Sequence, residues 1–305
     1  MNNSGNTRSR EQPAGAQAKP RVRTRVWPVA ILAACSAILL PSGATAQDRS
    51  AQAPAVSSRP QDEPPDWSPG PDWALSWSDS FGGSTSLDNW NLSTGGDGWG
   101  QEQLQYYSPA NVAIDSGSGL VMTSRKDGAE DQCWYGTCEY SSAQLDTKGH
   151  FQQQYGLFAA DIKLPRGRGL WPAFWMVGAN TGQVSPADSG EIDVVEINNQ
   201  SPANVITAFA HLHNQPQYTP MYTLSTPLSA AYHVYEVDWT SSGITFLVDG
   251  HAYGNVATQA GPPFNQPFYL ILSLAVGGKW PGSPDSSTVF PNQMDVAWIR
   301  AYTRK

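Results

Sequence analysis

Three carboxylates lie within one short stretch of this sequence, residues 190–200, which reads GEIDVVEINNQ. Glu191, Asp193 and Glu196 alternate with Ile and Val, residue types that favour an extended strand. Strict alternation would place Glu191 and Asp193 on one face of the strand and Glu196 on the other. A one-residue bulge at Val194 or Val195 restores the register, and we therefore expect all three acids on one surface.

Such a surface suits the hydrolysis of a glycosidic bond by two carboxylates. In the bulged strand the Glu191 and Glu196 side chains lean toward each other, which brings their carboxyl groups to roughly 5–6 Å, the separation in a retaining glycosidase. Asp193 between them would push their pKa values apart. On spacing alone, a solvated acidic strand and a calcium site remain open alternatives.

Further motifs flank the acidic stretch in a fixed order. They are Trp99-Gly100 with residues 104–107 (LQYY), Tyr155-Gly156 with residues 162–165 (IKLP), residues 171–176 (WPAFWM), residues 232–235 (YHVY) with Asp238-Trp239, residues 246–250 (FLVDG) and residues 275–278 (AVGG). Together with the acidic stretch they resemble glycoside hydrolase family 16, in its laminarinase-like branch, over residues 77–305. Many relatives outside that branch have regularly spaced acids. The two consecutive valines Val194 and Val195 break that spacing here and therefore favour the laminarinase-like branch.

The resemblance implies a fold and a division of roles. The fold is a jelly-roll sandwich of two antiparallel sheets with a substrate cleft across a concave face. Glu191 would be the nucleophile and Glu196 the acid/base, with Asp193 tuning both. We therefore expect a raised pKa for Glu196 and a lowered pKa for Glu191, because the acid must start protonated and the nucleophile ionised.

Several other residues are candidates for sugar contacts. Trp171 and Trp175 lie four residues apart. In the family this pair lines the cleft and stacks on sugar rings, whereas an average Trp is more often part of the core. Two His on one face of the strand expected at 205–213 suit hydrogen bonding near the acids better than metal binding. The expected substrate-binding residues are Trp171, Trp175, His211, His213, Trp99, Gln101 and Trp280.

Some positions depart from the family pattern. Gln101, Gln103 and Gln144 replace the usual Asn, Glu and Arg, which leaves the preferred glucan open. Ser80 and Ala297 stand where acidic residues contribute to the family's structural calcium site. We therefore expect bound calcium to be weak or absent, and no cofactor for catalysis.

The N-terminal 46 residues have the pattern of a signal peptide. Arginines precede an apolar run at 26–40, and Ala44-Thr45-Ala46 supplies a small-residue cleavage site. An alternative interpretation makes Cys35 the lipidated residue of a lipoprotein. Residues 47–72 are rich in Pro, Ala, Ser and Gln and are predicted to be a disordered linker. Residues 73–305 are then the catalytic domain.

Composition and charge narrow the class of partner. Cleavage after Ala46 removes six basic residues and one acidic residue, and leaves 12 Lys and Arg against 25 Asp and Glu, a net charge of −13. That charge disfavours nucleic acid, membrane surfaces and strongly anionic glycans. The 28 Gly, 24 Pro and 33 aromatic residues are typical of a turn-rich all-β protein. By default we expect a secreted monomer.

Strand patterns and two cysteines complete the prediction. Cys133 and Cys138, in an exported protein, favour a disulfide that shapes a loop at the cleft edge, over two free thiols or a metal pair. Runs of β-forming residues between Gly and Pro clusters predict strands at 120–124, 158–164, 205–213, 234–239, 244–248, 268–274 and 296–302.

The sequence thus predicts a secreted, retaining endo-glycosidase that hydrolyses β-glucan of the laminarin type, with β-1,3 linkages. One alternative is a β-glucan-binding protein without activity, although such relatives have lost catalytic acids that this chain keeps. A transglycosylase, or a hydrolase of another β-linked polysaccharide, would use the same three acids.

Overall fold

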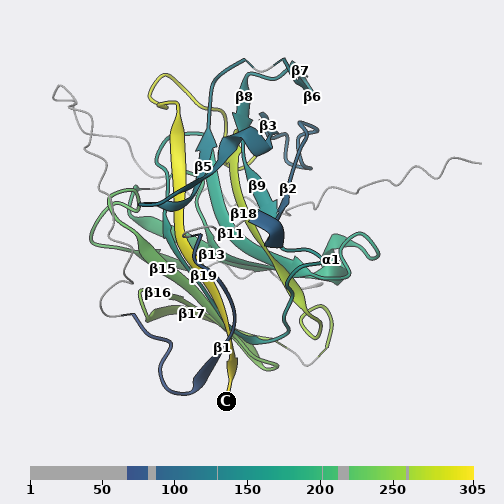
Figure 1. The fold of residues 1–305 in the computed structure, drawn as a ribbon, viewed down its shortest axis with the longest axis vertical. Coiled ribbons are helices and arrows are strands. Elements are labelled where there is room, and N and C mark those ends of the chain that lie inside the picture. The colour runs from purple at the N-terminus through teal and green to yellow at the C-terminus, as the bar shows by residue number, and fades with distance from the viewer. Residues whose placement is uncertain (1–66, 82–86, 129, 201, 212–219, 259–260) are drawn as a thin grey trace, which may run out of the picture.

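The computed structural model describes residues 67–81, 87–128, 130–200, 202–211, 220–258 and 261–305. The predicted signal peptide, Cys35, His213 and most of the predicted linker lie outside these residues. Strand makes up 50% of the structure and helix 5%, which confirms the all-β prediction. Two large antiparallel sheets pack face to face in the jelly-roll arrangement shown in Figure 1. In the described part of the chain, no helix is both long and apolar enough to cross a membrane.

The first sheet has eight strands and forms the side of the sandwich away from the acids. Its order is β17 (His251–Ala257), β16 (Gly243–Val248), β15 (His233–Trp239), β10 (Gly156–Lys163), β19 (Asn292–Arg304), β5 (Gly119–Ser124) and β4 (Val112–Asp115), with β1 (Trp73–Asp79) also paired to β19. The long β19 extends this sheet by pairing with three strands, β1, β10 and β5.

The second sheet has seven strands and carries the acids near its centre. Its order is β14 (Met221–Thr223), β13 (Val205–His211), β12 (Glu191–Glu196), β11 (Leu170–Gly178), β18 (Phe268–Val276), β9 (Gln144–Asp146) and β2 (Asn91–Leu92). Short elements complete the structure: the parallel pair β3 (Gln105–Tyr107) and β8 (Tyr140–Ser142), the hairpin of β6 (Gln132–Cys133) and β7 (Gly136–Thr137), and the one-turn helices η1 (Leu87–Asn89), η2 (Pro109–Asn111) and α1 (Pro186–Ser189).

The two central strands of the second sheet show how the core is divided from the site. Along β11, Phe174 and Met176 join the large core between the sheets, while Trp175 and Val177 pack in a separate cluster on the outer face. The strand β18 alternates in the same way. Both strands are buried along their whole length, so their sequences read as continuous apolar runs although their side chains serve two different faces.

Each strand predicted from the sequence pattern is present, with ends that differ by up to four residues and with the end of the 205–213 prediction outside the described residues. The important omission is β11, which contains Pro172 in mid-strand. The carbonyl of Pro172 accepts a hydrogen bond from Ile197 N, just beyond the end of β12. The N–H that Pro172 lacks would point to the same side, toward Ile197. Because Ile197 lies beyond the end of β12, the proline removes no hydrogen bond from within the β11–β12 ladder.

Trp67 lies within the predicted linker but contacts the first sheet. Trp67 packs against Trp298, with ring centroids 5.2 Å apart, and its indole N–H donates a hydrogen bond to Glu236. Glu236 on β15 is 3% exposed and also accepts a hydrogen bond from Gly250 N. The end of the predicted linker is therefore part of the domain.

Glu236 should make stability depend on pH. Burial raises the pKa of its carboxyl from 4.5 to about 7, and its two hydrogen bonds oppose the rise only partly. The protonated form is therefore favoured in the folded protein, and its stabilisation is lost as the pH rises from about 4.5 to about 7. The amide oxygen of Glu236→Gln can accept the same hydrogen bonds but does not titrate. We therefore expect the thermal unfolding midpoint of this variant to rise relative to that of wild type as the pH increases across that interval. An equal offset at every pH, as in the surface control Glu130→Gln, would contradict this.

Candidate active site

A β-bulge sets the direction of the three acids. On the β11 side, Phe174 pairs with Val195 and Trp175 pairs with Asp193, so that Val194 is an extra residue in β12. The pairing with β13 shifts over the same interval, between Asp193 and Glu196. The predicted bulge is thus confirmed, and the acids alternate with inward-facing Ile192, Val194 and Val195, which lie in the core.

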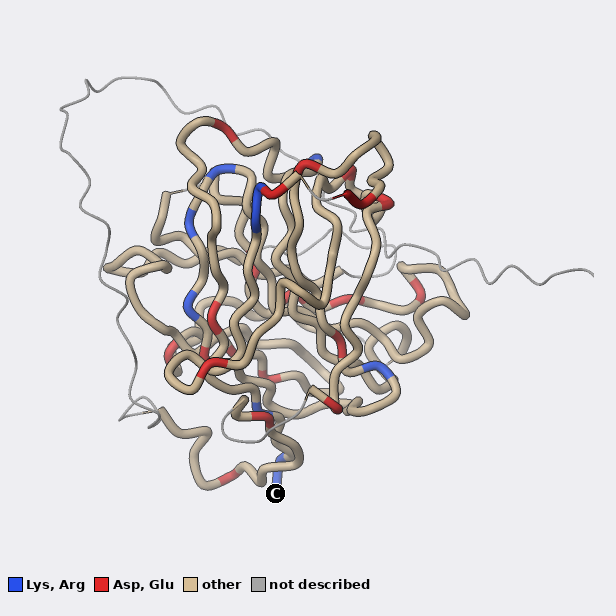
Figure 2. Tube along the Cα trace, turned by 45° about the horizontal axis from the view of Figure 1, so that its top comes forward, with Lys and Arg blue, Asp and Glu red and all other residues tan. Residues whose placement is uncertain are grey.

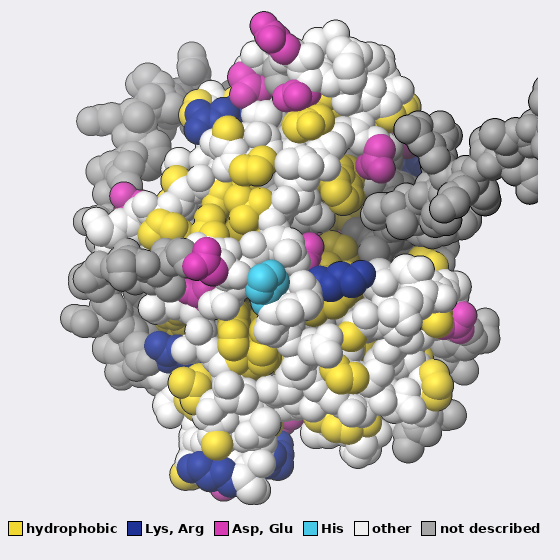
Figure 3. Space-filling view, turned by 45° about the vertical axis from the view of Figure 1, so that its right-hand side comes forward, with side chains coloured by type: hydrophobic (Ala, Val, Ile, Leu, Met, Phe, Trp, Pro, Cys, Tyr) yellow, Lys and Arg dark blue, Asp and Glu magenta, His cyan; other side chains and the backbone are white. Residues whose placement is uncertain are grey.

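A cavity of about 740 Å³ lies over the outer face of this sheet. Its wall combines aromatic side chains and uncharged polar groups with four acidic residues and one lysine, a lining that offers both ring faces and hydrogen-bonding groups to a ligand rich in hydroxyls. On the face drawn in Figure 3, yellow hydrophobic groups lie among white surface, and acidic and basic side chains are scattered between them. The cavity is lined by Ser93, Thr94, Gly95, Asp97, Trp99, Gln103, Gln144, Asp146, Lys148, Trp171, Ala173, Trp175, Thr181, Gly182, Gln183, Asp193, Glu196, Tyr269, Ile271, Ser273 and Ala275.

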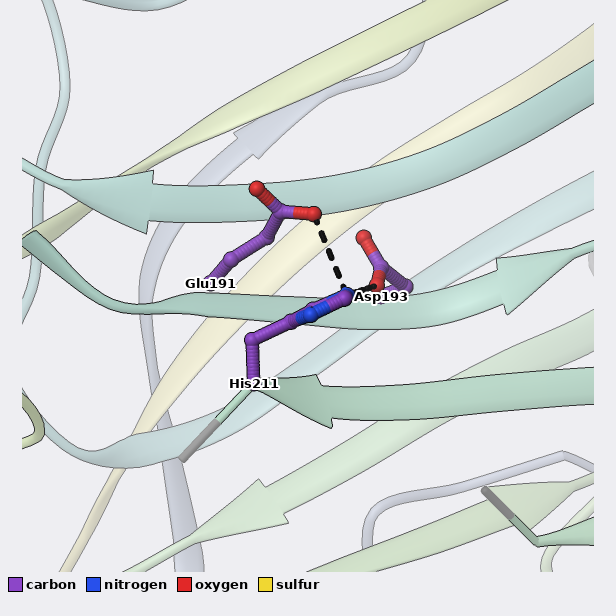
Figure 4. A group of neighbouring side chains, drawn as sticks. All are labelled: Glu191, Asp193 and His211. Carbon is purple, nitrogen blue, oxygen red and sulfur yellow. Dashed lines mark hydrogen bonds and ion pairs between the residues drawn. The ribbon is translucent and has the colours of Figure 1, made fainter. Parts of the chain in front are cut away.

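His211, on the neighbouring strand β13, joins two of the acids (Figure 4). Its Nε2 atom lies 3.0 Å from Asp193 Oδ2 and 3.3 Å from Glu191 Oε1. The first contact is a hydrogen bond, whereas Glu191 Oε1 is buried and has no hydrogen-bond partner among the described residues. Glu196 is held separately, by a 2.6 Å hydrogen bond from the indole N–H of Trp171.

Burial controls the protonation of the two glutamates. The pKa of Glu196 is raised well above its usual value, first by burial and then by the charges of Asp193 and Glu191. Burial and Asp193 also raise the pKa of Glu191, to about 8. The expectation of a lowered pKa for Glu191 is therefore wrong, because the nearby His211 offsets only part of the desolvation.

His211 holds its proton firmly. Burial by itself lowers the pKa of this imidazole, but the charge of Glu191 and the hydrogen bond and charge of Asp193 outweigh burial and raise the pKa to about 10. A cationic His211 therefore lies against Glu191 at neutral pH. Its contacts are to Glu191 and Asp193, so its charge favours ionisation of Glu191 more directly than that of Glu196.

The predicted sugar-binding residues fall into two groups. Trp171, Trp175 and Trp99 line the cavity. Gln101 and Trp280 are not part of its wall; Gln101 is buried, and Trp280 packs edge-on against Trp171 with ring centroids 5.3 Å apart. His211 acts through the acids, as the hydrogen-bonding interpretation predicts, and His213 lies outside the described residues.

Sequence reasoning missed residues on the far wall of the cavity. Tyr269 and Ser273 come from β18, and Ser273 accepts a hydrogen bond from the Trp175 indole N–H. The alternation of residues 268–276 would have identified them once one face was known to be outward. Lys148 lies 5.6 Å from the centre of the Tyr269 ring and donates to the carbonyl of Thr181. Nothing in the local sequence marks it.

Glu191, Asp193 and His211 also form the single group of potential metal ligands found among the described residues, with ligand atoms within 4.8 Å of one another. The hydrogen bond between Asp193 and His211 already uses one ligand atom of each. The absence of a catalytic metal and the weakness of calcium binding stay predictions. The disulfide between Cys133 and Cys138 is present, as predicted.

Paired carboxylates beside an aromatic-lined cavity on a β-sandwich are the arrangement expected of a glycoside hydrolase. The family model described as Glycosyl hydrolases family 16 matches residues 100–300, and the chain belongs to this family. It is 34% identical to a beta-glucanase of Rhodothermus marinus over 254 residues, covering 76% of this chain and 86% of the relative.

Two further proteins are similar over the same share of this chain. The structure resembles the endo-beta-1,3-glucanase of Pyrococcus furiosus with a TM-score of 0.71 and 35% identity, over 76% of this chain and 95% of the other. The chain is also 33% identical over 244 residues to the clotting factor G alpha subunit of Tachypleus tridentatus. That match covers 76% of this chain but only 34% of the longer relative.

The contact between Glu191 and His211 can be tested directly. In Glu191→Gln the negative charge beside the imidazole is lost, so the pKa of His211 should fall below its value in wild type. NMR titration of the His211 signal, assigned by its absence from His211→Asn, measures the change. The matched control Glu236→Gln alters a carboxyl on the other sheet and should leave the pKa of His211 unchanged. An unaltered pKa in Glu191→Gln would show that Glu191 is not ionised beside the ring.

Proposed function

We propose that this enzyme is an exported endo-glucanase that hydrolyses internal β-1,3 linkages of neutral glucans with retention of configuration. The observation that carries the proposal is the bulged strand that directs Glu191, Asp193 and Glu196 to one face, with Asp193 and Glu196 on the cavity wall. The similarity to proteins named beta-glucanase and endo-beta-1,3-glucanase supports the substrate class.

The roles follow from the electrostatics of the site. Glu196 begins protonated and donates its proton to the leaving oxygen, because its pKa is raised well above the usual value. Glu191, whose pKa is also raised, must lose its proton before it attacks the anomeric carbon, and the adjacent His211 cation favours that ionised form. After the leaving group departs, Glu196 removes a proton from water, and that water opens the glycosyl-enzyme.

Asp193 and Trp171 act as positioning residues in this scheme. Asp193 accepts the hydrogen bond from His211 and thereby fixes the ring against Glu191. Trp171 donates its indole N–H to Glu196 Oε1, which leaves the other carboxyl oxygen of Glu196 for the proton that is transferred. The Trp171 ring is almost wholly buried, so it offers little surface for stacking on a sugar ring.

Charge supports a neutral polymer over an anionic one. Figure 2 shows the basic residues in several separate stretches of the described chain. Lys148 is the single basic side chain on the cavity wall, and it is already engaged with Thr181. A sulfated or uronic acid chain would meet buried carboxylates without a compensating cluster of cations.

Reducing-sugar release is the decisive test of activity. The enzyme should release sugar from laminarin, with less or none from lichenan, agarose and xyloglucan. The variant Glu191→Gln should lose the activity to below roughly a thousandth of wild type, since the nucleophile is removed. Glu130→Gln, the same substitution at an exposed site, should retain it. Laminarin binding without hydrolysis would place the protein in the recognition class, and products longer than the substrate would indicate transglycosylation.

Azide separates the two glutamates by stereochemistry. With an activated β-glucoside, Glu196→Ala still forms the glycosyl-enzyme, and azide in place of water should give a β-glucosyl azide. In Glu191→Ala, azide instead attacks the face left empty by the nucleophile and should give an α-glucosyl azide. NMR of the products distinguishes the anomers, and the same anomer from both variants would refute the assignment of roles.

A further inference from the structure

A disulfide-closed loop borders one wall of the cavity. Strands β6 and β7 form a hairpin at residues 132–137, and the Cys133–Cys138 disulfide closes it. The hairpin packs closely on residues 95–105: a Cβ on Gly96 would come within 2.6 Å of the Cys133 sulfur. Trp134 N also donates a hydrogen bond to the carbonyl of Gly96.

The loop presents one exposed aromatic side chain, Trp134. It is 50% exposed and is the sole aromatic residue among the strongly exposed large hydrophobic residues of the described chain. Despite its exposure, Trp134 is fixed. Its indole N–H donates a 2.8 Å hydrogen bond to the carbonyl of Gln103, and its ring lies against Gly98, where a Cβ would come within 2.9 Å.

A second aromatic residue secures the loop. The Tyr135 ring meets Trp134 edge-on, with centroids 5.5 Å apart, and its hydroxyl donates to the carbonyl of Leu104 while accepting from Glu139 N. Solubility does not require a Trp that is both exposed and anchored. Leaving its apolar surface in water forgoes the stabilisation that burial would give. A rigid ring that is half exposed is instead suited to meeting a ligand at little entropic cost.

Trp134 and the cavity share one structural support. Gly95, Asp97, Trp99 and Gln103 line the cavity, whereas Trp134 contacts the same segment without being part of the wall. Residues 98–100 all have positive φ, between 49° and 83°, a tight turn permitted by the two glycines around Trp99. Trp99 belongs to this turn, and the Trp134 ring, on the hairpin, lies against Gly98 of the same turn.

We propose that Trp134 is a stacking platform for glucosyl units of the polymer that extend past the cavity, and that the disulfide holds the platform in place. This inference rests on the proposed function and adds a binding position to it. A sugar ring offers an apolar face that fits an exposed indole. Exposed Asp97, Asp131 and Glu139 surround the loop and disfavour an anionic glycan there, and one ring is far too small for a stable protein interface.

Chain length provides the test. With β-1,3-gluco-oligosaccharides of increasing length, Trp134→Ala should match wild type in kcat/KM on the shortest substrates cleaved and fall about three- to tenfold on the longest and on laminarin. The double variant Cys133→Ser/Cys138→Ser should show the same dependence on length. Leu75→Ala, an equally exposed apolar residue on the other sheet, is the matched control.

Binding is measured in parallel so that the result does not depend on turnover. In the Glu191→Gln background, affinity electrophoresis in laminarin should show weaker retardation when Trp134 is also replaced by Ala. A loss of equal size at all substrate lengths would assign Trp134 a purely structural role, and unchanged rates and retardation would refute the platform. If wild type cleaves no laminarin, the proposed activity fails, while the electrophoresis still decides whether Trp134 binds glucan.

Discussion

The site depends on one extra residue in a central strand. With regular pairing, Glu196 would point into the core between the sheets, where an unpaired carboxylate is costly. The bulge at Val194 instead lets Val194 and Val195 of β12, and Ile197 just after it, enter the core while keeping the three acids on the other face. The neighbouring strands adapt to the bulge at the same place, which fixes its position.

The same burial that stabilises the strand shapes the chemistry. Glu191, Asp193 and Glu196 are each no more than 5% exposed, so their negative charges are poorly solvated and close together. Two features reduce this repulsion and loss of solvation: the pKa of Glu191 is raised, and His211 lies against Glu191 and Asp193. The difference between the two glutamates comes from their neighbours: a cation contacts Glu191, and an indole N–H contacts Glu196.

Much of the fold could be predicted from the sequence because its strands follow simple rules. The alternation in 234–239 and the unbroken run of β-forming residues in 268–274, each bounded by turn residues, are local properties of the sequence. The strand with Pro172 could not be recognised in that way, because the proline is tolerated only where the ladder to β12 has ended. The early start of the domain at Trp67 likewise depends on a contact with Glu236, far away in the sequence.

The sequence by itself determined the class of chemistry, the family resemblance and the acids, because spacing and residue type along one strand decide which side chains can act together. It also determined the cysteine pair, whose short separation leaves few alternatives. Tertiary structure alone decided the direction of the Glu191 pKa shift, the partners of His211 and the far wall with Tyr269 and Lys148. These properties arise from desolvation and from contacts between strands distant in sequence, and local patterns do not encode them.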